Sequence, residues 1–183
     1  MFPKRFRIPV LSLLFLTAAQ AEPERSFSLT ISPIHLALPV LEFTGEYALA
    51  PNFGVAAIAG YGTTELEHSD GTKEDIGILE LGAQAAYYPF GDFKGGMQVG
   101  GELLWIKPFL PKEEDITVSA NGVAIGPMVG YKWVTEFGLT IFLQGGYQFL
   151  FASAKAENSA GEEAEASGDT GIPLVNINAG WSF

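Results

Sequence analysis

The chain has 183 residues, of which 22 are glycine, 13% are aromatic and only 17% are charged, and its formal net charge is -11. Its mean hydropathy is nevertheless positive, at +0.21. The acidity argues against nucleic acid as a partner, because neutralising phosphate requires Lys and Arg. The absence of cysteine excludes disulfide scaffolds, thiol catalysis and cysteine metal sites. The length fits one domain, or one domain behind a removable leader.

Residues 1–21 have the features of a secretory signal peptide. Three basic residues precede an apolar run, and Ala19-Gln20-Ala21 forms a small-x-small cleavage site. The apolar run is too short to span a membrane comfortably, which disfavours an N-terminal membrane helix. We therefore expect cleavage after Ala21, which leaves residues 22–183 as the mature domain. This part of the chain contains no apolar run long enough to predict a membrane helix.

The mature chain alternates between apolar and polar residues with a period of two, which predicts β-strands. The eight predicted segments are 26–36, 39–50, 53–64, 76–89, 95–107, 118–133, 137–153 and 172–183. The polar side of these segments carries mainly Gly, Ala, Gln, Asn and Ser, which suit the crowded inside of a narrow barrel. The large apolar side chains then point outward, where lipid accepts them. The pattern predicts an all-β fold, an eight-stranded antiparallel up-and-down transmembrane β-barrel.

Aromatic residues gather at the ends of the segments, as expected for the girdles of a barrel at the two membrane interfaces. These residues are Phe53, Tyr87, Tyr88, Phe90, Trp133, Phe137, Trp181 and Phe183. A soluble lipocalin-like carrier would instead keep its apolar face inside, so the girdles and the aromatic C-terminus disfavour it.

The connections between the segments alternate in length. Those at 50–52, 90–94 and 134–136 are short, whereas those at 65–75, 108–117 and 154–171 are longer and polar. Outer-membrane barrels have short periplasmic turns and long external loops, so the long connections are predicted to lie outside the cell. The acidic segment 154–171 is expected to be a mobile, solvated loop.

The C-terminal segment carries apolar residues at every second position and ends on an aromatic residue. These residues are Val175, Ile177, Ala179, Trp181 and Phe183. The pattern resembles the terminal assembly signal of Gram-negative outer-membrane barrels. The resemblance implies that the barrel-assembly machinery recognises the C-terminal strand.

Two further stretches carry a family resemblance. Residues 46–55 (EYALAPNFGV) are similar to the first periplasmic turn of OmpW-type proteins, and residues 83–92 (AQAAYYPFGD) are similar to the second. The chain thus resembles the small eight-stranded outer-membrane proteins of the OmpA, OmpX and OmpW sort. This implies a monomer in the outer membrane of a Gram-negative bacterium, in contact with outer-membrane lipids and lipopolysaccharide.

The candidate functional residues are the polar side chains predicted to point into the barrel. They are Glu42, Glu46, Glu80, Glu102, Lys132, Gln144 and Asn176. Most of them are expected to form a band at mid-height, with Glu46 lower and Lys132, the one assignable inward cation, near the periplasmic rim. Carboxylates in a closed interior must pair, protonate or keep water. The band is therefore interpreted as a hydrogen-bonded polar plug, with a narrow cation-preferring path as the alternative.

No catalytic, cofactor or metal site is predicted, because His35 and His68 have no Ser or Asp partner at a meaningful spacing. An enzyme is not expected. The leading hypothesis is an integral outer-membrane barrel with acidic external loops and a structural or surface-interaction role, whose extracellular partner is unknown. The alternative is a narrow channel for cations or small solutes that uses the inward carboxylates.

Overall fold

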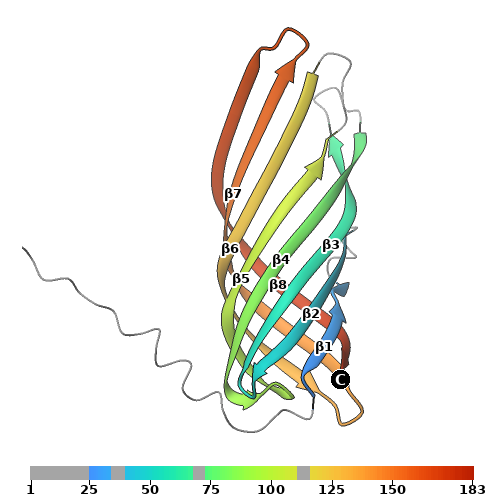
Figure 1. Cartoon of the computed structure of the whole chain (residues 1–183), viewed down its shortest axis with the longest axis vertical. Helices are drawn as coiled ribbons and strands as arrows, with labels where there is room; N and C mark the ends of the chain where they lie inside the picture. The colour runs from blue at the N-terminus through green and yellow to red at the C-terminus, as the bar shows by residue number, and fades with distance from the viewer. Residues whose placement is uncertain (1–24, 34–39, 68–72, 111–115) are drawn as a thin grey trace, which may run out of the picture.

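The computed structural model describes residues 25–33, 40–67, 73–110 and 116–183, and these form a closed barrel (Figure 1). Each strand pairs antiparallel with its neighbour in sequence, and β8 returns to pair with β1. The strands are β1 (Phe27–Ile31), β2 (Val40–Ala50), β3 (Phe53–Glu67), β4 (Lys73–Asp92), β5 (Gly95–Phe109), β6 (Ile116–Val134), β7 (Leu139–Asn158) and β8 (Glu163–Ser182). The predicted leader (1–21), His35 and His68 lie outside the described residues.

The predicted alternation is confirmed in the orientation of the side chains. Along β2, Leu41 and Phe43 are exposed on the outside, whereas Glu42 and Thr44 between them are buried inside. The same parity holds along β8, where Val175 is 58% exposed and Asn176 is 4% exposed. An apolar exterior around a polar interior is the reverse of a soluble protein and is the arrangement of barrels that lie in lipid. In the described part of the chain, no helix is both long and apolar enough to cross a membrane.

The strands are strongly tilted and differ in length, so the barrel wall is uneven. β1 has 5 residues and pairs with β8 only from Ser28 to Ile31, whereas β7 and β8 have 20 residues each. The upper ends of β6, β7 and β8 rise together above the rest of the ring (Figure 1). The first strand was predicted to reach residue 36, and the structure ends it at Ile31.

One end of the barrel carries the short turns that the sequence predicts. They join β2 to β3 at Pro51–Asn52, β4 to β5 at Phe93–Lys94, and β6 to β7 at residues 135–138. The last of these turns requires glycine, because Gly138 has φ +107° and a Cβ atom there would lie 2.5 Å from Trp181 Nε1.

At the opposite end, the prediction of a mobile loop over 154–171 is wrong. β7 and β8 stay in register up to Glu157 opposite Glu163, and a tight turn closes the hairpin. The Asn158 side chain accepts hydrogen bonds from the backbone N–H groups of Ala160 (3.1 Å) and Glu162 (2.8 Å), which sets the turn. The segment is acidic and rich in small residues, as loops often are, but its backbone groups are paired as in the rest of the sheet.

Candidate functional site inside the barrel

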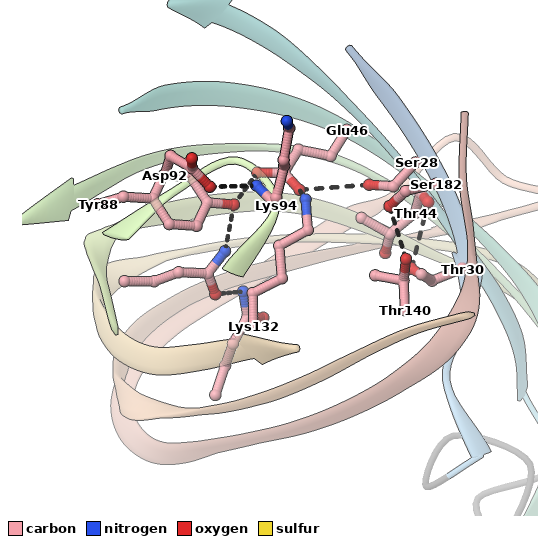
Figure 2. A network of polar contacts seen from close by, with 12 residues as sticks. Ser28, Thr30, Thr44, Glu46, Tyr88, Asp92, Lys94, Lys132, Thr140 and Ser182 are labelled. Carbon is pink, nitrogen blue, oxygen red and sulfur yellow. Dashed lines mark hydrogen bonds and ion pairs between the residues drawn. The ribbon is translucent and has the colours of Figure 1, made fainter. Parts of the chain in front are cut away.

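The lower part of the interior, near the short turns, is organised around one buried ion pair. Lys132 on β6 lies with its Nζ atom 2.7 Å from Oε2 of Glu46 on β2. Both residues are buried, with exposed fractions of 0% and 3%. Tyr88 on β4 donates a hydrogen bond of 2.6 Å to Oε1 of Glu46, so both carboxylate oxygens have partners (Figure 2). A buried charge is tolerated only when it is paired and hydrogen-bonded in this way.

Two glutamines extend this ion pair across the barrel. Gln98 on β5 donates to the Tyr88 hydroxyl (2.8 Å), and Gln144 on β7 donates to the Gln98 side-chain oxygen (3.0 Å). The resulting chain of hydrogen bonds crosses the interior from β2 to β7. Because each of these side chains comes from a different strand, the network fixes the strands relative to one another.

An aromatic residue closes the barrel at the short-turn end. Phe93 lies in the turn between β4 and β5 and is fully buried, and its backbone N–H donates to the Pro51 carbonyl (2.7 Å) of the neighbouring turn. The Lys132 ammonium lies 3.3 Å from the centroid of the Phe93 ring and 4.9 Å from that of Phe142. Both contacts are within cation–π distance. We refer to Glu46, Tyr88, Phe93, Lys132 and Phe142 as the basal seal.

A second layer of polar side chains lies above the basal seal. Glu102 on β5 accepts hydrogen bonds from the side-chain amides of Gln84 and Gln148. Gln84 also reaches the Gln144 oxygen (3.5 Å), which connects this layer to the chain of glutamines below. Asn176 donates to the same oxygen (3.5 Å), so the two layers form one network.

The last two of the predicted inward carboxylates, Glu42 and Glu80, lie on the two strands that flank Gly60. In the register of the sheet, Gly60 on β3 lies between Glu42 on β2 and Glu80 on β4. The Oε2 atom of Glu80 would be only 3.1 Å from a Cβ atom at position 60, so glycine leaves the space that this carboxylate occupies. Oε2 of Glu80 is buried and accepts no hydrogen bond from the described residues.

A separate group of hydroxyl side chains lies where β1 meets β8. Thr140 and Ser182 share a hydrogen bond of 2.6 Å, and Thr30 donates to the Thr44 carbonyl (3.4 Å) (Figure 2). All four residues are buried. The Asn178 side-chain amide on β8 donates to the Thr44 hydroxyl on β2 (3.4 Å), so a hydrogen bond passes across the short strand β1 and supports the closure of the ring.

Six of the seven polar residues predicted to point inward are buried, and Glu80 is partly buried. The structure brings Glu46 together with Lys132, and connects Glu102, Gln144 and Asn176 through hydrogen bonds. The predicted band left out Gln84 and Gln148. Each lies four residues along its strand from a predicted inward residue, so the same alternation was sufficient to find them.

The placement of Tyr88 in the outer aromatic girdle is wrong. Its side chain is 1% exposed and lies inside the barrel, whereas Tyr87 is 41% exposed and points outward. Neighbouring residues of a strand face opposite sides, so the two tyrosines cannot share the girdle. The pairing of β4 with β5 shifts between Tyr87 and Phe90, and this irregularity returns Phe90 to the outside.

Within residues 25–33, 40–67, 73–110 and 116–183, no three His, Asp or Glu side chains are grouped so that they could hold a metal ion.

Comparison with known proteins identifies the fold. The solution structure of outer membrane protein W from E. coli superposes with a TM-score of 0.58 at 14% sequence identity, over 89% of this chain and 100% of that one. The chain has the fold of a small outer-membrane β-barrel. The predicted fold, eight antiparallel up-and-down strands in a closed ring, is thereby confirmed.

Three further comparisons were made, with a second solved structure, with protein-family models and with curated proteins. A major outer membrane protein from Thermus thermophilus superposes with a TM-score of 0.49 at 14% identity, over 86% of this chain and 100% of that one. No family model matches the sequence. No curated protein matches it either.

The C-terminal residues of this barrel form its closing seam. Val175, Ile177, Trp181 and Phe183 are exposed on the outside, and Ala179 is partly exposed. The Phe183 carbonyl accepts a hydrogen bond from the Ser26 N–H (2.9 Å), and the Phe183 ring stacks on Phe27 with 6.5 Å between the ring centroids. The last residue of the chain therefore contacts the start of the first strand.

Proposed function

We propose that the protein is an integral outer-membrane barrel with a closed interior, and that it has a structural or surface-interaction role instead of a transport role. The proposal accounts for the apolar exterior, for the polar interior and for the similarity of the fold to outer-membrane protein W. Export follows from the signal peptide at residues 1–21, and recognition of the C-terminal strand by the assembly machinery follows from the pattern that ends at Phe183.

The observation that carries this proposal is the basal seal. An eight-stranded barrel is narrow enough for side chains to fill it. Here, fully buried Phe93 and Lys132 occupy the short-turn end, and the Lys132–Glu46 pair ties opposite parts of the wall together. Opening a path past them requires separating a buried ion pair, which costs several kcal/mol.

The surface that such a protein offers to partners is the hairpin formed by the upper parts of β7 and β8. It is acidic, with Glu157, Glu162, Glu163 and Glu165 near its tip, and the residues from 159 to 171 are all exposed. In the proposed orientation this hairpin lies outside the cell, next to the sugars and phosphates of lipopolysaccharide.

The test combines two assays of membrane insertion with single-channel recording in planar bilayers, all on refolded residues 22–183. Heat-dependent gel mobility and resistance to carbonate extraction establish that the barrel is inserted. Inserted protein that gives no single-channel current supports the closed barrel. Frequent openings in the unmodified protein contradict it.

A narrow cation path is the second candidate, and the inward carboxylates favour it. Glu42, Glu80 and Glu102 lie above the basal seal, and Oε2 of Glu80 accepts no hydrogen bond from the described residues. If the bilayer measurement gives cation-selective openings, Glu80→Gln and Glu102→Gln are expected to weaken the selectivity. The outward substitution Glu165→Gln on β8 serves as the matched control.

A further inference from the structure

The outward face of β6, β7 and β8 changes from apolar to charged in four successive rows of residues. Each row takes one residue from each strand, as the register of the sheet pairs them. From the barrel upward, the rows are Ile125–Phe149–Gly171, Val123–Phe151–Asp169, Asn121–Ser153–Ser167 and Ser119–Lys155–Glu165. We call the ring of outward-facing apolar side chains below these rows the apolar belt. The boundary between this belt and the charged hairpin therefore falls at the second and third rows.

A groove with a volume of about 460 Å³ lies at this boundary. Its lining includes Phe151 and Val123 from the second row, together with all three residues of the third. Ser153 and Ser167 are small, and they lie between the bulky Phe151 below and the longer Lys155 and Glu165 above. Asp169, at the β8 end of the second row, also lines the groove, as do the small residues Gly122, Ala152 and Gly168.

We propose that this groove binds the sugar headgroup of a glycolipid whose acyl chains lie along the apolar belt beneath it. The inference rests on the proposed function, since it requires the barrel to lie in a membrane with the hairpin outside. Continuity with the belt argues for a membrane-anchored ligand, because Phe149 and Ile125 extend the apolar lining of the groove toward the membrane.

The polar groups of the groove match the hydroxyl groups of a sugar. Asn121 provides an amide that can donate and accept hydrogen bonds, the two serines provide hydroxyls, and the Asp169 carboxylate accepts hydrogen bonds from donors. The Phe151 side chain, 53% exposed, provides the flat apolar surface beside them. A few placed polar groups next to an aromatic ring are the usual composition of a small-ligand site.

The charges argue against phosphate as the group recognised. Asp169 lines the groove, and Glu165 lies in the row above it. Among the residues of the four rows, Lys155 is the one cation, and its contact with Glu165 raises the pKa of Lys155. An anionic headgroup would be repelled by Asp169 without gaining a free cation.

The experiment measures lipid retention by native mass spectrometry. Residues 22–183 are reconstituted in nanodiscs that contain equal amounts of monoglucosyl diacylglycerol and phosphatidylglycerol with the same acyl chains. The unmodified barrel is expected to retain the glucosyl lipid in preference to phosphatidylglycerol by about tenfold, the ratio that corresponds to about 1.4 kcal/mol. Ser153→Trp, which fills the groove, is expected to abolish this preference.

Matched variants separate the groove from general lipid contact. Thr63→Trp places the same side chain on the outward face of β3, elsewhere on the ring, and should leave the preference unchanged. Ser167→Trp fills the groove from β8 and provides a second, independent measurement. Asp169→Asn should reduce the preference for the glucosyl lipid.

Two results would overturn the inference. The first is equal retention of the two lipids by the unmodified barrel, and the second is an unchanged preference in both tryptophan variants of the groove. Failure of the proposed function is detected separately, because a chain that is not a membrane barrel does not enter the nanodisc.

Discussion

The Lys132 ammonium lies 3.3 Å from the centroid of the Phe93 ring, at the point where the turn between β4 and β5 folds under the barrel. The same ammonium is 2.7 Å from the Glu46 carboxylate on the other side. The Lys132 cation on β6 thus connects Glu46 on β2 with Phe93, the buried ring of the turn, which we call the aromatic plug. Because Lys132 contacts Glu46, Phe93 and Phe142 at once, a substitution at one residue of the basal seal changes the contacts of the others.

Removing the cation is expected to destabilise the barrel strongly. Lys132→Met keeps much of the side-chain volume but leaves the Glu46 carboxylate buried without its partner, and such a change costs about 3–5 kcal/mol. The free energy of unfolding, measured by urea titration of the refolded barrel in detergent, should fall by this amount.

A double substitution is the control for this prediction. Glu46→Gln combined with Lys132→Met removes both charges, and the oxygen of the introduced amide can still accept the hydrogen bond from Tyr88. The double variant should recover most of the lost stability. If it is no more stable than Lys132→Met alone, the ion pair is not the reason for the loss.

The aromatic plug should contribute to stability in its own right. Phe93→Ala removes a fully buried ring beneath the ion pair, and the loss of a buried phenylalanine costs about 3–5 kcal/mol. Phe137→Ala is a suitable control, since Phe137 lies in another short turn at the same end and is 64% exposed. Urea titration should show the larger loss of stability for Phe93→Ala. Phe137→Ala gives up its ring contact with Trp181 (5.7 Å between centroids) and should cost about 0.5–1.5 kcal/mol.

The sequence predicts the parity of the strands well, because the pleat of a β-strand forces neighbouring side chains to opposite faces. Once Leu41 and Phe43 are assigned to the outside, Glu42 and Thr44 must point inward, and the structure places them there. The short turns were also predictable. When only a few residues separate two alternating segments, the chain can reverse its direction at few other positions.

The contacts inside the barrel were not predictable in the same way. Glu46 and Lys132 are 86 residues apart in the chain, and whether they meet depends on the stagger of the strands around the ring. Phe93 lies in a turn, where alternation does not apply. The hairpin of β7 and β8 was misread because its composition resembles a loop, whereas its structure is set by pairing with the neighbouring strand.

The turn between β6 and β7 tests the requirement for glycine. Gly138→Ala places a Cβ atom against Trp181 and Arg25 in a backbone with φ +107°, so it should lower the free energy of unfolding by more than about 2 kcal/mol. Gly161→Ala is the matched control, because Gly161 also has a positive φ (+80°) but has nothing within 4 Å of the added atom. Its cost should be limited to the backbone term of about 1 kcal/mol. Equal losses in the two variants would mean that the contact with Trp181 contributes nothing.

The tip of the β7–β8 hairpin should be stabilised locally by Asn158. Asn158→Ala removes the two hydrogen bonds that its side-chain oxygen accepts from the N–H groups of Ala160 and Glu162. Amide hydrogen exchange at these two positions should become faster by about tenfold, as expected for a loss of about 1.4 kcal/mol. The amides of β7 near Gln144 and the urea midpoint should not change, because the tip lies far along the strand from the interior network. If exchange at Ala160 is equally fast in the unmodified protein and in Asn158→Ala, the tip behaves as the mobile loop that the composition suggests, and the paired hairpin ends lower on β7.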